Sequence, residues 1–304
     1  MTANMRYLLE EELPHGTSLQ PVELLHYDSG EGTGFPQGYY APLHWHNHME
    51  ILYFRRGDFV VELNLEEVLF REGDIAIINS GQLHQIVSNT RDSSHDVLLF
   101  DPKILSFSYG DELQESLLAP LIRQEYIFPG KIASHSPLHQ EISAIIRQLI
   151  QICSEKQEHW YYYAKLQVLF LLIRLQEVGG LIPSKTVLGG LERERIDKYK
   201  KIISYMEENY MHPISLAQLA EHISCNPQYL CHFFKKTAGV SPVDYLIRLR
   251  IKKAKTMLKE SNLSVLEIGM ECGFDNASYF ARQFRRHTGH SPREYRNLIQ
   301  SGRS

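Results

Sequence analysis

Long apolar stretches are missing from this chain of 304 residues. The longest strongly apolar run covers residues 168–173, far short of the about 20 residues that a membrane-spanning helix needs. The beginning of the chain also lacks the apolar core of a signal peptide, because it runs into three glutamates at residues 10–12. These absences argue against a membrane partner and predict a cytoplasmic protein.

Cysteine is scarce too, and no two cysteines form a C-x-x-C pair. The four are Cys153, Cys225, Cys231 and Cys272. Cysteine-based zinc sites and redox-active dithiols usually need such pairs, so neither is expected of these cysteines. The four thiols are interpreted as small buried hydrophobes in a reducing compartment.

Positive charge is scarce in the first part of the chain and abundant in the last. Residues 1–190 contain 13 Lys and Arg against 24 Asp and Glu, whereas residues 191–304 contain 19 against 12. A basic C-terminal third on an acidic body indicates a polyanionic partner for that third alone. Solvated helix faces would give the same count, so charge does not decide the function.

The patterning divides the chain into four segments. Residues 1–110 contain short alternating runs, such as 50–54 and 59–65, between turns at Gly57-Asp58 and Gly73-Asp74, which is typical of an all-β sandwich or barrel. Residues 111–177 become helical, residues 178–192 are rich in Gly and predict a linker, and residues 193–304 are helical to the end.

The helical segment 111–177 predicts a hairpin of two helices. Apolar residues at steps of 4, 3, 4 and 3 form a stripe on the first helix: Leu138, Ile142, Ile145, Leu149 and Ile152. The second helix, about 159–177, is apolar nearly all round, which predicts burial on two sides, and one face carries Tyr162, Leu166, Leu169 and Ile173. The hairpin either packs within its own chain or forms the interface of a homodimer.

The C-terminal segment contains an internal repeat, in which residues 214–245 recur as residues 263–295. The matching positions are Leu219, Tyr229, Phe234, Gly239, Ser241, Pro242 and Tyr245 in the first copy, and Ile268, Tyr279, Phe284, Gly289, Ser291, Pro292 and Tyr295 in the second. The offset is 49 residues before an internal turn and 50 after it, so the second turn holds one residue more.

Each copy predicts a helix-turn-helix unit, because helix caps and glycines stand where the helices should begin and end. These signals are Ser215, Asn226, Pro227 and Gly239 in the first unit, and Ser264, Gly273, Asn276 and Gly289 in the second. The second helix of such a unit can lie in the major groove of DNA.

The two second helices have an aromatic face and a polar face. The aromatic face predicts the core: Tyr229, Leu230, Phe233 and Phe234, then Tyr279, Phe280 and Phe284. The polar face predicts DNA contacts: Gln228, Cys231, His232, Lys235 and Lys236, then Asn276, Ser278, Ala281, Arg282, Arg285 and Arg286. Gln and Arg suit base edges, and Lys235, Lys236, Arg285 and Arg286 suit phosphates. A merely exposed polar stripe is the alternative.

A basic helix at about 243–259 connects the two units and should set the distance between them. Two helices that read one face of B-DNA lie about 34 Å apart.

The C-terminal region 196–296 resembles the DNA-binding domain of AraC/XylS transcription regulators. The resemblance is carried by Ala254-Lys255, residues 268–274, residues 278–280, Phe284 and residues 288–296. It implies a domain of seven helices with two helix-turn-helix units that bind double-stranded promoter DNA, with activation commoner than repression and RNA polymerase as a further partner.

The N-terminal segment carries two spaced motifs. The first is Gly38-x5-His44-x-His46-x3-Glu50-x6-Gly57, and the second is Gly73-x5-Asn79-x-Gly81-x2-His84. They resemble the two motifs of the cupin barrel, a double-stranded β-helix. The second motif departs at Asn79, where the pattern has Pro, and at Ser88, where it has Asn, but neither departure removes a ligand.

Alternating positions place His44, His46, His48 and Glu50 on one strand face, and His84 can join them from a neighbouring strand. His44, His46, Glu50 and His84 would suit a divalent metal such as Zn, Fe, Mn or Ni. The same residues could instead hydrogen-bond a polar effector directly. Tyr39 is expected in the pocket wall, and His48 is interpreted as an exposed bystander.

The sequence therefore predicts a multidomain protein: an N-terminal all-β cupin barrel, a helical hairpin connector and a C-terminal all-α domain with two helix-turn-helix units. The predicted function is transcription regulation controlled by a small-molecule effector, such as a sugar or related metabolite. A metal-dependent cupin enzyme fused to a DNA-binding domain is one alternative, which the two DNA-reading units disfavour. An effector-independent DNA-binding protein is the other.

Overall fold

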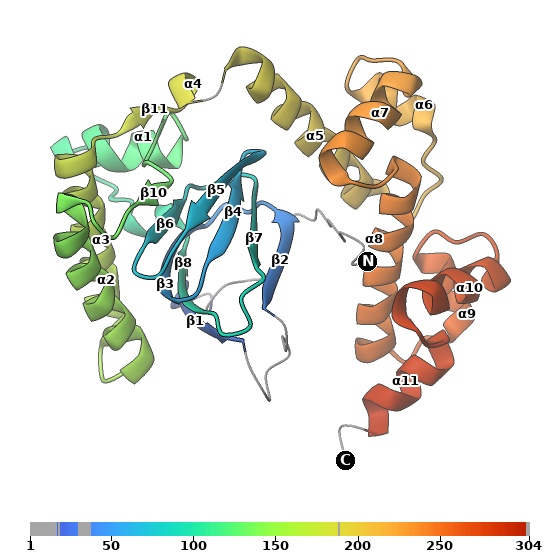
Figure 1. The fold of residues 1–304 in the computed structure, drawn as a ribbon. Coiled ribbons are helices and arrows are strands. Elements are labelled where there is room, and N and C mark those ends of the chain that lie inside the picture. Colours follow the sequence, from blue (N-terminus) through green and yellow to red (C-terminus); the bar gives the residue numbers. More distant parts are fainter. Residues whose placement is uncertain (1–16, 18, 30–37, 188, 302–304) are drawn as a thin grey trace. The chain divides into compact units, whose positions relative to one another are not determined.

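The computed structural model describes residues 17, 19–29, 38–187 and 189–301 (Figure 1). The acidic run at residues 10–12 lies outside them. The described chain forms two compact units, divided between Glu194 and Arg195.

The first unit is built on two antiparallel sheets. The five-stranded sheet has the order β1-β8-β3-β6-β10 and the four-stranded sheet the order β2-β7-β4-β5. The strands are β1 (Val22–Asp28), β2 (Tyr39–His44), β3 (Met49–Arg56), β4 (Phe59–Leu63), β5 (Glu66–Phe70), β6 (Ile75–Ile78), β7 (His84–Ser88), β8 (Ser94–Phe100) and β10 (Lys131–Ile132). This arrangement confirms the predicted all-β fold of the N-terminal part.

Alternation along the strands separates two hydrophobic clusters. One cluster lies between the two sheets. It contains Leu52 of β3 and Val97, its partner on the neighbouring strand β8 of the same sheet. This interior cluster includes Leu52, Phe54, Phe59, Val61, Phe70, Ile78, Ile86, Val97 and Leu99. Neighbouring residues of the same strands, such as Ile51 and Leu98, belong to the second cluster on the outer face of the five-stranded sheet.

Two long helices cover that outer face: α2 (Pro137–Glu155) and α3 (Trp160–Gly179) (Figure 1). Ile142, Ile145 and Leu149 of the predicted stripe are buried in the cluster that joins helices and sheet, and Ile152 packs against it. The side chain of Leu138 lies outside the described ones. The stripe therefore packs inside its own chain and is not an exposed subunit interface.

The opposite side of α3 is exposed, so the predicted burial on two sides is not achieved within a single chain. Tyr162, Tyr163, Leu166 and Phe170 are 63%, 59%, 64% and 48% exposed. The sheet and α2 cover only one side of α3, which is where Leu169 and Ile173 pack against the core. An apolar surface of large side chains remains uncovered in the single chain.

Short elements connect the barrel to the second unit. They are η1 (Pro102–Leu105), η2 (Gln114–Leu118), α1 (Ala119–Ile122), β9 (Tyr126–Ile127), β11 (Ile182–Pro183) and α4 (Ser184–Val187). Strand β11 pairs with β9, so the glycine-rich segment 178–192 carries secondary structure of its own. Strand β10, beyond residue 110, pairs with β6 of the barrel.

Among the described residues, the secondary-structure elements of the second unit are all helices, which confirms the predicted all-α domain. Its helices are α5 (Gly190–Asn209), α6 (Leu216–His222), α7 (Pro227–Ala238), α8 (Pro242–Glu260), α9 (Val265–Glu271), α10 (Ala277–Thr288) and α11 (Pro292–Ser301). Ser215 and Ser264 form capping boxes with Gln218 and Glu267. The first helices of the two helix-turn-helix units therefore begin in the same way. No helix among the described residues is long and apolar enough to cross a membrane.

The cysteines follow the sequence prediction only in part. Cys153 and Cys272 are buried, and burial raises the pKa of each thiol to about 11. Cys225 and Cys231 are only partly buried, because they lie in the turn and on the outer side of the first helix-turn-helix unit.

Candidate DNA-reading surface and effector site

Helices α7 and α10 are the second helices of the two helix-turn-helix units. Asn226 caps α7 by accepting a hydrogen bond from the Tyr229 amide at 2.7 Å, and Asn276 caps α10 in the same way at 2.9 Å. Gly239 and Gly289 end them with positive φ angles of 72° and 78°. The side chain of Asn276, predicted to contact DNA, is thus engaged in capping.

Most of the predicted DNA contacts lie on the surface of their helices. The exposed ones are Gln228, His232, Lys235 and Lys236 on α7, and Ser278, Arg282, Arg285 and Arg286 with Asn276 on α10; Cys231 and Ala281 are partly buried. The opposite faces hold the core residues Leu230, Phe233, Phe234, Phe280 and Phe284. Each helix therefore presents a polar, mostly cationic face next to a buried aromatic one.

Tyr229 corrects one sequence prediction, since it is 43% exposed instead of buried. It stands in the first turn of α7, where the helix extends beyond the core. Its ring stacks on Phe233 at a centroid distance of 5.8 Å, and Lys198 lies over it at 6.0 Å. On α10 the Arg282 guanidinium lies 5.4 Å from the Tyr279 ring, a cation–π contact that orients this exposed arginine.

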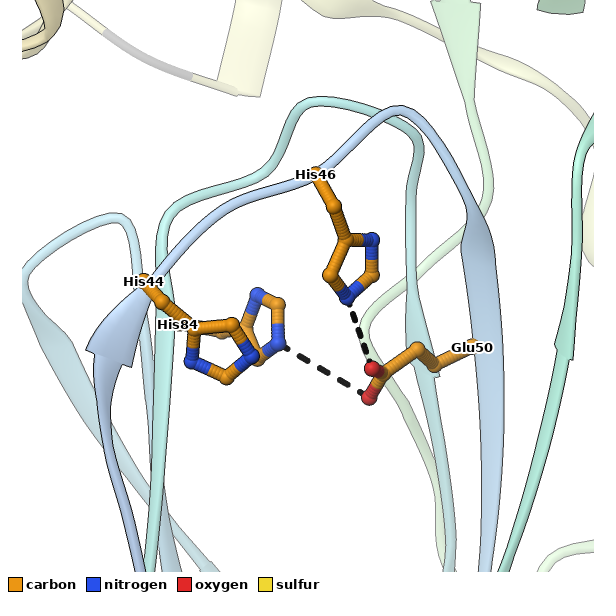
Figure 2. Close-up of side chains that lie close together, drawn as sticks. All are labelled: His44, His46, Glu50 and His84. Atoms are coloured by element: carbon orange, nitrogen blue, oxygen red, sulfur yellow. Dashed lines mark hydrogen bonds and ion pairs between the residues drawn. The ribbon is translucent and has the colours of Figure 1, made fainter. Parts of the chain in front are cut away.

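The barrel brings together His44, His46, Glu50 and His84, as Figure 2 shows. One potential ligand atom from each residue lies within 4.8 Å of all the others. His46 Nε2 lies 2.8 Å from Glu50 Oε1, and His84 Nε2 lies 3.7 Å from Glu50 Oε2. His46, Glu50 and His84 are at most 4% exposed, and His44 is 9% exposed.

Backbone carbonyls fix the orientation of all three imidazoles. The Nδ1 atoms of His44, His46 and His84 lie 2.6, 3.1 and 2.8 Å from the carbonyl oxygens of Pro42, His48 and Gln82. A carbonyl only accepts, so each Nδ1 is the protonated donor. In the neutral rings, Nε2 then carries the lone pair that can bind a metal.

The protonation states of the cluster suit metal binding. Burial alone raises the pKa of Glu50, but the neighbouring imidazoles of His84 and His46 outweigh it and hold that pKa well below its usual value. Burial and, to a smaller extent, the neighbouring His44 lower the pKa of His84 to about 4. Glu50 is therefore ionised and His84 neutral at pH 7, as metal ligands must be.

The donor set also fits a metal in size. Two ligands at about 2.1 Å from one ion lie at most about 4.2 Å apart, so only a small contraction is needed. Among the described residues, the buried His84 Nε2 has no hydrogen-bond partner, and it faces the Glu50 carboxylate. A lone pair beside an ionised carboxylate is unfavourable unless a cation lies between them.

Tyr39 and His48 lie elsewhere. Tyr39 contacts His95 of β8, with ring centroids 4.4 Å apart, and belongs to the other end of the interior. His48 is partly buried beside His46, with ring centroids 5.7 Å apart, and its carbonyl accepts the His46 hydrogen bond. His48 is thus not the exposed bystander that the sequence predicted.

His95 is a residue that the sequence reasoning missed. It is 1% exposed, and neither of its ring nitrogens has a hydrogen-bond partner in the part of the chain that the structure describes. The rings of Tyr27 and Phe59 lie 5.1 and 5.0 Å from it. Period-two alternation with Val97 and Leu99, which face the interior, would have indicated its position.

Comparison with known proteins agrees with both domains. Residues 29–172 match the family model of the AraC-like ligand binding domain, and residues 219–298 match that of a helix-turn-helix domain. A ligand-binding barrel and a DNA-binding domain in one chain define a transcription regulator with a sensor domain.

Curated relatives match this chain over most of their length. The chain is 28% identical to the HTH-type transcriptional activator RhaS of Escherichia fergusonii, over 86% of this chain and 89% of that protein. It is 26% identical to the uncharacterized HTH-type transcriptional regulator YdiP of Escherichia coli, over 84% and 80%. A solved AraC-type regulator structure from Chromobacterium violaceum is 30% identical over 34% of this chain and 92% of its own, with a TM-score of 0.33. The chain belongs to the AraC family of transcription regulators.

Proposed function

We propose that a small polar effector controls promoter binding by this regulator, and that it binds in the barrel at a divalent metal. The observation that carries the proposal is the common orientation of three imidazoles. Their Nδ1 atoms donate to backbone carbonyls, so the Nε2 atoms of His44, His46 and His84 are left to meet the Glu50 carboxylate.

Three imidazoles and one carboxylate suit first-row divalent ions such as Zn, Fe, Mn or Ni. Such an ion supplies a Lewis acid for the oxygen atoms of an effector, for example the hydroxyl or carboxylate groups of a sugar or related metabolite. The protein's own residues hold the donors in place and exclude water, because the interior below the cluster is lined by Leu52, Ile86 and Leu99.

Regulation requires the effector to bind one arrangement of the two units more tightly than another. We infer that α7 and α10 enter the major groove of promoter DNA, with RNA polymerase as a further partner at the promoter. The site of action is the cytoplasm, where that DNA lies. The two alternative functions, an enzyme and an effector-independent DNA-binding protein, predict different results in the tests described below.

The uncovered side of α3 supports a homodimer. Tyr162, Leu166 and Phe170 recur at steps of four along this helix, and Tyr163 lies beside them. A contiguous apolar surface of this kind marks an interaction site. A two-fold contact between copies would use the same surface twice, so one helix could supply both halves of the interface.

Elemental analysis of the full chain without a His-tag tests the metal. We expect about one equivalent per chain, lost on chelation and in both His46→Ala and His84→Ala, whereas the surface control His135→Ala retains it. The two cluster variants should keep effector-free DNA affinity and lose the effector response. Absence of metal from wild type, with the effector response intact, would favour a bare polar pocket.

Two further results would decide between the function classes. Turnover of a candidate sugar or aromatic acid by the metal-loaded chain would support the enzyme. DNA affinity that no metabolite changes would support the effector-independent protein.

A further inference from the structure

A contact away from both recognition helices joins the two helix-turn-helix units. Residues 210–212, which precede the first unit, lie against the turn of the second unit at residues 272–274. Arg250 of α8 lies at this contact: its Nε donates to the Tyr210 carbonyl at 2.8 Å, and Nη2 donates to the His212 carbonyl at 2.8 Å. The same guanidinium lies 5.7 Å from the centre of the Phe274 ring.

Gly273 makes the contact close. It has a φ of +77°, and a Cβ added there would lie 2.5 Å from the Tyr210 carbonyl oxygen and 2.9 Å from that of Met211. Both are backbone atoms, so the loop would have to move to admit a side chain. The turn of the second unit therefore rests directly on the backbone that leads into the first.

Arg250 is a basic residue of the connecting helix that serves the interior of the domain. It is partly buried, and burial lowers its pKa. A guanidinium is costly to remove from water unless its donors are satisfied, and here two backbone carbonyls accept hydrogen bonds from it. These bonds tie α8 to the segment before α6 while the ring contact ties it to the second turn.

We propose that Arg250, with Gly273, is a positioning residue that fixes the separation and orientation of α7 and α10. The domain then binds tightly only to DNA whose two half-sites have the matching spacing. A rigid link makes the second half-site contact nearly intramolecular, but only for the spacing that the link allows. The inference rests on the proposed function, in which both helices read DNA.

The experiment uses the full chain and a duplex selected by wild type from a random library. Three probes are compared: the selected duplex, the same duplex with one half scrambled, and duplexes with one or two base pairs inserted between the halves. The variants are Arg250→Ala, Arg250→Lys and the matched control Lys259→Ala, which removes an exposed positive charge from the same helix.

For Arg250→Ala we expect affinity for the selected duplex to fall about tenfold, and affinity for the half-scrambled duplex to stay within about twofold of wild type. The loss of affinity caused by an inserted base pair should shrink. Arg250→Lys keeps the charge but loses the planar pair of donors. Its affinity and its insertion penalty should therefore lie between those of wild type and those of Arg250→Ala. Lys259→Ala should change affinity for every probe by the same factor.

The possible outcomes distinguish a failure of the proposed two-helix function from a failure of the proposed role of Arg250. Wild type that binds the half-scrambled duplex as well as the intact one overturns the two-helix function itself. Wild type that needs both halves, with Arg250 variants that keep its full insertion penalty or weaken on all probes equally, overturns the role of Arg250. If Arg250→Ala does not fold, the insertion profile of Arg250→Lys decides by the same criterion.

Discussion

Ser224 and Gly273 occupy the same position in the turns of the two helix-turn-helix units, and both have a left-handed backbone. Their φ angles are 54° and 77°. The Ser224 amide donates to the Glu221 carbonyl at 2.9 Å, and the Gly273 amide donates to the Met270 carbonyl at 2.8 Å. The internal repeat is thus a repeat of backbone geometry, with glycine in the copy whose turn contacts the Tyr210 backbone.

This pair predicts opposite effects of substitution on stability. Ser224→Gly should raise the free energy of unfolding by up to about 1 kcal/mol, because glycine accepts a positive φ without strain. Gly273→Ala should lower it by about 2 kcal/mol or more, because strain and the collision with backbone atoms add. Urea unfolding of the full chain measures both.

Gly289→Ala is the matched control. Gly289 has a φ of +78°, and no atom of the described residues lies within 4 Å of an added Cβ, so only the backbone strain remains. Equal losses for Gly273→Ala and Gly289→Ala would show that the contact with residues 210–211 contributes nothing.

His95 predicts how the stability of the metal-free protein depends on pH. Burial lowers its pKa to about 4, whereas an imidazole in the unfolded chain titrates near 6.5. Between these values the unfolded chain binds the additional proton, so the free energy of unfolding falls as the pH drops from about 6.5 towards 4. One such histidine contributes up to about 1.4 kcal/mol per pH unit, and His84 acts in the same direction.

His95→Phe should remove one of these contributions. We expect the fall in unfolding free energy between pH 6 and pH 5 to shrink by about 1 kcal/mol, since phenylalanine cannot be protonated. Denaturant titrations in the presence of a chelator measure it, with the exposed His135→Phe as control. An unchanged slope would mean that His95 is hydrated or hydrogen-bonded in the folded protein.

On the DNA-reading surface, replacement of Arg282 and replacement of Lys235 should have different effects on DNA binding. Arg282→Ala is expected to weaken specific binding by about 1–3 kcal/mol and to relax base preference at one position. Lys235→Ala should weaken binding to all sequences and reduce the salt dependence. Titrations of selected and random duplexes at several salt concentrations compare them. Equal effects of both changes on both duplexes would contradict this division of roles.

Much of this architecture could be predicted because its signals are local. Ser215, Asn226, Ser264 and Asn276 cap the helices they were expected to cap, since a cap depends on the next three residues alone. Motif spacing likewise indicated the four potential metal ligands, His44, His46, Glu50 and His84. They do not share one strand face as alternation predicted, because β2 ends at His44, Glu50 lies on β3, and these strands belong to different sheets.

Predictions failed where the answer depends on tertiary packing. Helical periodicity places Tyr229 beside Phe233, but it does not show that the core ends before the first turn of α7. Tyr39 precedes His44 by five residues on an extended strand, a distance of about 16 Å, so it reaches His95 instead of the cluster. An all-apolar helix does not reveal that the sheet and α2 cover only one side of α3.

The last prediction concerns that side of α3. Leu166 is 64% exposed, so Leu166→Glu should leave the fold of the chain intact while placing unpaired charges at the contact between two copies. Ile145, by contrast, is 6% exposed within the core, and Ile145→Glu should destabilise the chain itself. Light scattering at micromolar concentration should give twice the chain mass of 35.3 kDa for wild type and a single chain mass for Leu166→Glu. Thermal unfolding should be nearly unchanged in Leu166→Glu apart from the loss of dimer stabilisation. Glu177→Lys, at an exposed position near the far end of the same helix, serves as the control. A monomeric wild type, or a Leu166→Glu variant that remains fully dimeric, would show that α3 is not the dimer interface.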